Sequence, residues 1–253
     1  MINNQNYKIA NKEISLLYLN YKEGEKIKDE SIAEILIQSK RIIKRYFKTK
    51  LFLKTNQIPI GGKKYLNCER AFDIFTKHSV MPEYCFSCYK IQIDTKNVVD
   101  LIKLYFLFDI LYFENENLRK CMIDLRKNIK GNYKGFIYCT TQVEAKKIKS
   151  YVGKYLKESI DEDIKFHIKR GCSEFVEKYP EFGNLEKNTM DYKKEWKKIE
   201  HEFDANNNKV YKSGIRKLVY GLNLKHILVF ENWIDFAKKK GDQSYKVLTK
   251  DNG

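Results

Sequence analysis

The stretch from Met81 to Pro180 constrains the fold most, because strand-like and helix-like patterns follow one another there in a clear order. Four short runs alternate apolar and polar residues, which is typical of strands, and two longer apolar segments have the spacing of helices. The strands are expected at Tyr89–Ile93, Cys121–Leu125, Gly135–Cys139 and Ile164–Ile168, and the helices at Val98–Phe113 and Gln142–Glu158.

The order strand, helix, strand, strand, helix, strand predicts an α+β protein with a ferredoxin-like βαββαβ core. Its sheet should be antiparallel, in spatial order 4-1-3-2, with both helices on one face. We expect this core at residues 81–182, a mainly helical N-terminal extension at 1–80 and a helical C-terminal extension at 183–253. The first core helix is apolar nearly all round, so an extension should cover its outer side, which favours one integrated domain.

Local signals support the helices. Asn97 can cap the first core helix, and Thr141 with Glu144 forms a Thr-x-x-Glu capping box at the start of the second. Outside the core, helices are predicted at Ser31–Lys48, Glu69–His78 and Leu185–Asp204, a turn at Gln57–Lys64, and either a strand or a helix at Leu224–Phe230.

The charge of the chain favours a polyanionic partner. The sequence has 49 Lys and Arg residues against 33 Asp and Glu residues, a net charge of +16. Such an excess suits RNA, DNA or an anionic membrane face, although a lysine-rich solvated surface has the same composition. The N-terminal residues are polar and no apolar run is long enough to span a bilayer, so we expect a cytoplasmic protein.

The outer sheet face combines bases with aromatic rings. Strand alternation directs one set of side chains away from the core helices. This set comprises Lys90, Gln92, Asp124, Phe136, Tyr138, Lys165, His167 and Lys169. A second basic surface is expected on the helix Ser31–Lys48, from Arg41, Lys44, Arg45 and Lys48, although favourable interaction with the helix dipole also accounts for it. The terminal segments could also cover the two aromatic rings.

The run Lys134-Gly-Phe-Ile-Tyr138 resembles the opening of the RNP1 motif of RNA-recognition motifs. The resemblance covers about a third of the chain, and Ile137 stands where that motif has Gly or Ala. It implies that Phe136 and Tyr138 stack on the bases of single-stranded RNA and that Lys134 contacts phosphate.

Five of the six cysteines are predicted to converge on one end of the sheet. Given the expected strand directions, this end would gather Cys85, Cys88, Cys121, Cys139 and Cys172. The Cys-x-x-Cys spacing of Cys85 and Cys88 suits metal ligation, so a zinc ion or an iron–sulfur cluster is one interpretation. Buried free thiols are the other, because cysteine often simply packs in apolar surroundings.

Cys172 has a second interpretation, as a catalytic nucleophile. It lies between the last strand and a short predicted helix, and Arg170 is two residues before it. A cation and a helix N-terminus both stabilise a thiolate, and the same backbone could hold a phosphate group. The sequence therefore favours a protein that binds a polyanion, first of all single-stranded RNA. The alternative is a thiol- or metal-dependent enzyme acting on a phosphorylated substrate.

Overall fold

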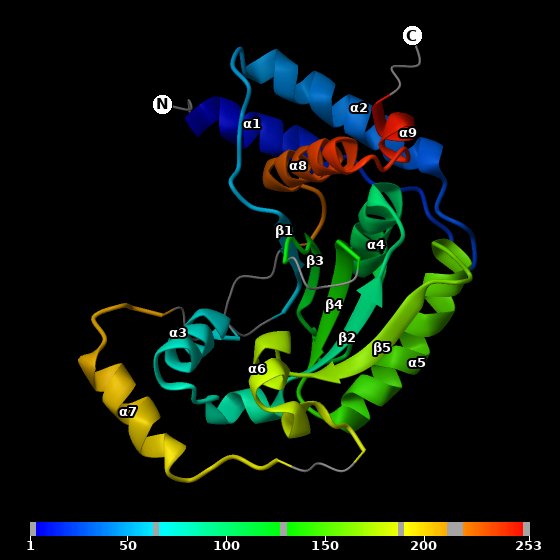
Figure 1. Ribbon diagram of the computed structural model, residues 1–253. Coiled ribbons are helices and arrows are strands. Elements are labelled where there is room, and N and C mark those ends of the chain that lie inside the picture. The colour runs from blue at the N-terminus through cyan, green and yellow to red at the C-terminus, as the bar shows by residue number, and fades with distance from the viewer. Residues whose placement is uncertain (1–3, 63–65, 127–130, 187–189, 212–219, 250–253) are drawn as a thin grey trace.

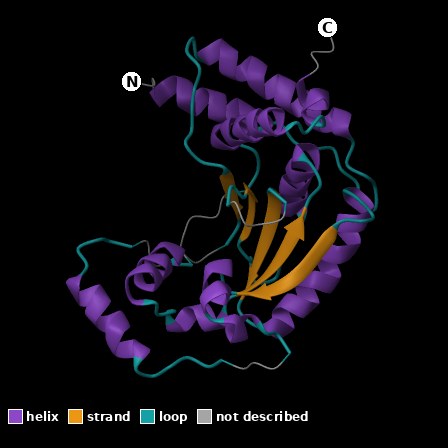
Figure 2. Ribbon diagram, in the orientation of Figure 1, coloured by secondary structure: helices purple, strands orange, loops and turns teal. Residues whose placement is uncertain are grey.

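The computed structural model describes residues 4–62, 66–126, 131–186, 190–211 and 220–249 (Figure 1). These residues form helices around a single sheet (Figure 2). The strands are β1 (Gln57–Ile60), β2 (Tyr89–Asp94), β3 (Arg119–Ile123), β4 (Tyr133–Cys139) and β5 (Lys165–Arg170). The α-helices are α1 (Asn4–Ser15), α2 (Asp29–Tyr46), α3 (Cys68–His78), α4 (Val98–Ile110), α5 (Gln142–Ser159), α6 (Ser173–Lys178), α7 (Trp196–Asn206), α8 (Leu224–Lys240) and α9 (Tyr245–Thr249), with 3-10 helices η1 (Glu83–Ser87) and η2 (Pro180–Gly183).

The protein is α+β, with a five-stranded antiparallel sheet in the order β1-β3-β4-β2-β5. Four of these strands, β5, β2, β4 and β3, correspond to the strands expected from the sequence. They lie side by side in that order, which is the expected order 4-1-3-2. The register places Lys90 opposite Tyr138 on one side and opposite Lys169 on the other. These three side chains therefore lie in one row across the sheet.

Strand β1 corrects the prediction of a turn at Gln57–Lys64. Ile58 and Ile60 are buried while Gln57 and Pro59 are exposed, so the segment alternates as a strand does. It pairs with β3 at the edge of the sheet, where a proline without an N–H group is tolerated. Proline and the following glycine pair favoured a turn, and four residues are too few for alternation to outweigh them.

Helices α4 and α5 cover one face of the sheet, as predicted (Figure 1). The Asn97 side chain accepts a hydrogen bond from the Asp100 N–H at 2.9 Å, and the Thr141 hydroxyl accepts one from the Glu144 N–H at 3.1 Å. Helix α4 is buried almost all round because α2, α8 and α9 pack on its outer side. None of the helices in the described ranges is long and apolar enough to cross a membrane.

The buried apolar residues form two separate cores. The larger core lies between the sheet and α1, α2, α4, α5, α8 and α9. The smaller core joins α3, η1, α6, η2 and α7, around residues such as Phe175 and Trp196. Each core draws residues from all three segments expected from the sequence, 1–80, 81–182 and 183–253. The extensions are therefore interleaved with the sheet unit.

The C-terminal elements decide one open prediction and correct the bounds of another. Leu224–Phe230 belongs to helix α8, which packs against α1, α4 and β1. The helix predicted at Leu185–Asp204 is shorter, because α7 begins only at Trp196; residues 187–189 lie outside the described ranges. Helix α7 is joined to α3 by Arg70, whose guanidinium donates to Glu200 and Asp204.

Candidate functional site

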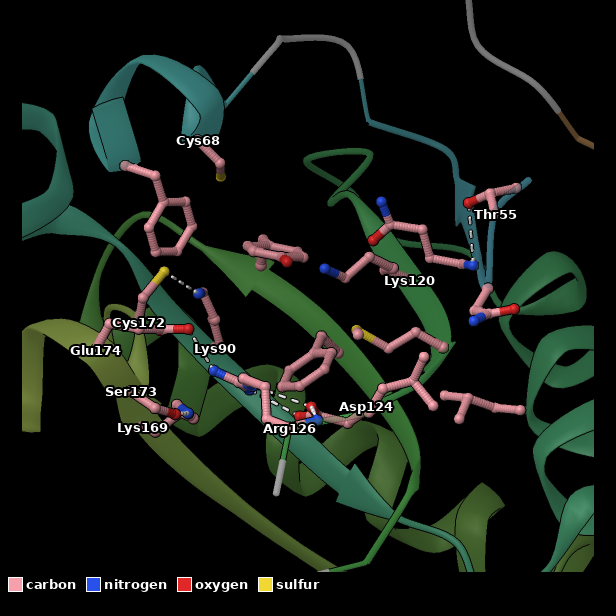
Figure 3. Close-up of a pocket in the computed structure, with 18 residues that line it drawn as sticks. Thr55, Cys68, Lys90, Lys120, Asp124, Arg126, Lys169, Cys172, Ser173 and Glu174 are labelled. Atoms are coloured by element: carbon pink, nitrogen blue, oxygen red, sulfur yellow. Dashed lines mark hydrogen bonds and ion pairs between the residues drawn. The ribbon is translucent and has the colours of Figure 1, made fainter. Parts of the chain in front are cut away.

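The outer face of the sheet holds a cavity of about 580 Å³, here called the lysine cavity. Lys90 from β2, Lys120 from β3 and Lys169 from β5 line it together with Phe136 and Tyr138 from β4. Figure 3 shows Lys90 and Lys120 pointing into the cavity, with Cys68 of α3 and Cys172 before α6 at its far side. Strand alternation and the N-terminal end of α6 therefore bring these groups together.

The three lysines carry the positive charge of this cavity. Among the described residues, no carboxylate lies within ion-pair distance of Lys90, Lys120 or Lys169. Burial, followed by repulsion from the charge of Lys90, lowers the pKa values of both Lys120 and Lys169. Burial also opposes the charge of Lys90, but the Cys172 and Cys88 sulfurs outweigh it and raise the pKa of Lys90. An anion in the cavity would relieve the repulsion among the three.

A fourth cation, Arg126, is already neutralised. It donates to the carboxylates of Asp124 at 2.7 Å and Glu174 at 2.6 Å, as the dashed lines in Figure 3 show. These bonds hold the pKa of Asp124 below its usual value, against the opposing effect of burial. They tie the end of β3 to α6 and close one side of the cavity. Arg126 is therefore a structural link, and the lysines are the groups left for a ligand.

The aromatic rings of the expected RNA-binding face line the cavity but do not form an open platform. Phe136 is 6% exposed and Tyr138 is 9% exposed. Lys120 Nζ lies 5.5 Å from the Phe136 ring centroid, and Lys90 Nζ lies 5.2 Å from that of Tyr138. The long lysine side chains lie against the rings and cover them. This corrects the expectation that both rings are open to a passing strand of RNA.

The other predicted nucleic-acid contacts are dispersed. Lys134 is 2% exposed and donates to Asp94 at 2.8 Å, so its expected contact with phosphate is not available. A lysine this deeply buried needs a carboxylate partner, which Asp94 on the neighbouring strand provides. Lys165 and His167 are exposed on β5 and share the outer face, but they lie outside the lysine cavity.

The basic end of α2 does not join the lysine cavity. Helix α2 packs against α1, α4, α8 and α9, on the side of the molecule that holds the core helices (Figure 1). Arg41, Lys44 and Arg45 of α2 are exposed, and so is Lys48, which lies two residues beyond the end of the helix at Tyr46. Arg45 forms an ion pair with Glu13 of α1 at 3.0 Å. The sheet face and the basic helix are thus two separate surfaces.

Four of the five predicted thiols do come together. Cys85, Cys88, Cys139 and Cys172 line a second cavity of about 690 Å³, here called the cysteine cavity, and Cys68 of α3 joins them. Cys121 does not, which corrects the prediction. It sits mid-strand in β3 with its side chain on the helix face, fully buried in the larger core. Strand β3 begins two residues earlier than expected, so Cys121 is not at the sheet end.

Burial raises the pKa values of four thiols that line the cysteine cavity. Burial raises the pKa of Cys88 to about 11 and that of Cys139 to about 12, and it also raises the pKa values of Cys68 and Cys85. All six cysteines are free. Within the described ranges, no three His, Cys, Asp or Glu side chains are placed so that they could hold a metal ion. The described residues thus give the zinc or iron–sulfur interpretation no support.

Arg170 is not the partner of Cys172. It points to the helix face of β5, where it is 5% exposed and donates to the Phe86 carbonyl at 3.1 Å. Its guanidinium also lies over the Phe182 ring. The cation beside Cys172 is Lys90, whose Nζ donates to Cys172 Sγ at 3.1 Å. Lys90 pairs with Lys169, the residue next to Arg170, so Lys90 and Arg170 face opposite sides of the sheet. The chain then turns at Gly171, with φ of 57°, before it reaches Cys172.

Sequence reasoning missed two lining residues, Lys120 and Cys68. Lys120 precedes the strand predicted at Cys121–Leu125, and extending the alternation back by one residue would have placed it on the outer face. Cys68 had no signal, because only the tertiary fold brings α3 to the sheet. The chain matches no family model, no curated protein and no solved structure.

Proposed function

We propose that this protein binds a polyanion, first of all single-stranded RNA, through the lysine cavity. The observation that carries the proposal is the convergence of Lys90, Lys120 and Lys169 on one cavity without a carboxylate partner in the described residues. Lys90 is buried and Lys120 and Lys169 are half-buried, and cations in such positions that lack a counterion favour a ligand that brings one. Phosphate groups of a nucleic acid supply that charge, and lysines are common phosphate ligands.

The aromatic residues support a nucleic acid over a simple anion. Phe136 and Tyr138 line the same cavity as the lysines, so a ligand there meets both positive charge and flat apolar surface. Recognition of single-stranded RNA uses this combination of phosphate contact and base stacking. A base reaches either ring only when Lys120 or Lys90 moves from its place over the ring towards a phosphate group.

A proposal about the fold belongs with this function. We regard the β2-α4-β3-β4-α5-β5 unit as a ferredoxin-like core extended by the edge strand β1, which the order β5-β2-β4-β3 supports. The resemblance of Lys134–Tyr138 to RNP1 enters only as support for the ligand class. The contacts in the lysine cavity carry the proposal without it.

Binding of a fluorescently labelled RNA 12-mer to the full chain, followed by anisotropy over a series of salt concentrations, tests this function. Lys90→Met and Lys120→Met should each weaken binding and reduce the salt slope by about 0.7. The matched control is Lys157→Met, which removes an exposed lysine from α5 on the other side of the sheet. Unfolding midpoints of all three variants establish that they fold. The proposal fails if no oligonucleotide binds at low salt, or if the control loses as much affinity as the cavity variants.

One contact favours a second candidate function, a thiol-dependent enzyme acting on a phosphorylated substrate. Lys90 Nζ donates to Cys172 Sγ at 3.1 Å, which places a cation beside a sulfur nucleophile at the edge of the same cavity. Incubation with an aryl phosphate, followed by intact-mass analysis, would reveal a covalent adduct that Cys172→Ser abolishes. Unchanged mass and the absence of released phenol would remove this candidate.

A further inference from the structure

The lysine cavity and the cysteine cavity adjoin. Four residues line both of them, Cys68, Phe72, Tyr138 and Cys172. Two of them, Cys68 and Cys172, are labelled in Figure 3 among the residues that line the lysine cavity. A ligand held at the lysines can therefore extend past Tyr138 into a second space of comparable volume.

The two cavities differ in charge. The described lining of the cysteine cavity contains no Lys, Arg or His, and its two acidic residues are Glu116 and Glu144. The Glu144 carboxylate is already held by the Asn117 amide at 2.9 Å and the Thr140 N–H at 2.6 Å. An anionic group is thus favoured on the lysine side and disfavoured on the cysteine side. A ligand spanning both should have one anionic end and one neutral end.

Two residues that line the cysteine cavity each carry a buried acceptor without a donor among the described residues. Asn67 Oδ1 and Asn117 Oδ1 are buried and lack a hydrogen-bond partner within the described ranges. The orientation of the Asn117 amide is fixed, because its Nδ2 donates to the Tyr138 carbonyl at 2.8 Å and to Glu144. A buried acceptor without a donor is unfavourable, so each oxygen favours a ligand that carries N–H groups.

We infer that the ligand unit is a nucleotide, with its phosphate at Lys90, Lys120 and Lys169 and its base in the cysteine cavity. Phe72 and Tyr138 provide flat surfaces at the junction, and Asn67 and Asn117 accept hydrogen bonds from the base. Adenine, cytosine and guanine each carry an amino group with two N–H donors, whereas uracil has a single N–H, so bases with an amino group are preferred over uracil. This inference rests on the proposed function of the lysine cavity and names the unit that it recognises.

Calorimetric titration of the full chain with AMP, UMP, adenosine and ribose 5-phosphate tests the inference. AMP should bind about fivefold more tightly than UMP, as expected for one additional hydrogen bond, and more tightly than ribose 5-phosphate or adenosine. Asn67→Gly removes one acceptor and suits the left-handed backbone there, with φ of 48°. This variant should weaken AMP binding about fivefold and leave the affinity for ribose 5-phosphate unchanged. Lys90→Met should weaken the binding of both ligands, and Lys157→Met should weaken the binding of neither.

The outcomes separate this inference from the function on which it rests. If the RNA 12-mer binds but AMP, UMP and ribose 5-phosphate have equal affinities, the base does not enter the cysteine cavity and only the inference falls. If neither RNA nor any nucleotide binds, both fall. Loss of ribose 5-phosphate binding in Asn67→Gly would also contradict the assignment, because that variant should affect the base alone.

Discussion

Arg119 of β3 closes the C-terminal end of α4 by donating from Nη1 to the Leu111 carbonyl at 2.9 Å. The same guanidinium donates to the Phe108 and Asn117 carbonyls and lies over the Phe113 ring. Arg119 is 1% exposed. One buried arginine therefore satisfies carbonyl oxygens that the helix itself leaves without partners.

Replacement of this arginine should destabilise the fold severely. Arg119→Met keeps an apolar chain of similar length but leaves three buried carbonyl groups without a donor, so the free energy of unfolding should fall by about 3 kcal/mol or more. Urea denaturation measures the change. Arg41→Met, on the exposed side of α2, should change it by less than about 0.5 kcal/mol. Equal effects would mean that Arg119 does not hold the end of α4.

The capping box of α5 gives a smaller and more local prediction. Thr141→Ala removes the hydroxyl that accepts the Glu144 N–H, which should cost about 1 kcal/mol of the free energy of unfolding. Val143→Ala, in the same helical turn and 78% exposed, is the matched control and should be nearly neutral. The prediction is wrong if the two variants have the same denaturation midpoint.

His226 should make the protein less stable in acid. Burial lowers the pKa of His226 to about 4, from an ordinary value of 6.5; its ring nitrogens meet the Tyr105 hydroxyl and the Asn223 amide, and Lys225 adds a like charge. Below pH 6.5 the His226 imidazole is protonated in the unfolded chain, whereas in the folded chain it is protonated only below about pH 4. This contribution is therefore complete above pH 6.5 and is lost as the pH falls.

The loss can be assigned by comparing variants. Between pH 7 and pH 4.5, wild type should lose about 2.5 kcal/mol more than His226→Gln in urea denaturation. His201→Gln, which replaces an exposed histidine of α7, should follow wild type. Parallel pH profiles for wild type and His226→Gln would show that His226 titrates normally.

The buried thiols should resist alkylation. A pKa of about 11 leaves Cys88 with about 100-fold less thiolate at pH 7 than a thiol at the reference value of 9.0. Iodoacetamide labelling read by peptide mass spectrometry should therefore be slow at Cys88 and Cys139 and should rise about tenfold per pH unit. In guanidinium chloride both sites should react like ordinary cysteines. Fast labelling in the native protein would contradict the burial of these groups.

The sheet could be predicted from the sequence because the alternation of apolar and polar residues along a strand is visible in the sequence itself. Tyr89–Ile93 and Gly135–Cys139 pair as expected, since a slip of one residue would expose Ile91 and Ile137. The ends of strands were harder. Arg119 and Lys120 look like loop residues, but Arg119 is buried with its guanidinium on helix carbonyl groups, and Lys120 is half-buried against two aromatic rings. The groups that surround these two side chains come from segments that are distant in the sequence, so no local sequence pattern predicts them.

The candidate site was predictable only in part, for the same reason. Alternation correctly placed Lys90 and Lys169 on the outer face, but it could not show that Lys134 is paired with Asp94. Nor could it show that Cys68 and Phe72 of α3 approach Tyr138. The smaller core determines that approach, because it anchors α3 to α6 through Phe75 and Phe175.

The interleaving of the three segments has a consequence for how the chain reaches its native state. Asn11 in α1 accepts a hydrogen bond from the Leu224 N–H at 3.0 Å, across more than two hundred residues of sequence, and α8 completes the larger core. Contacts of such high sequence separation form late, because a long loop must close first. During synthesis, α1 and the outer side of α4 can pack against α2, but they lack α8 until it has left the ribosome. Folding to the native core is therefore expected to be largely post-translational.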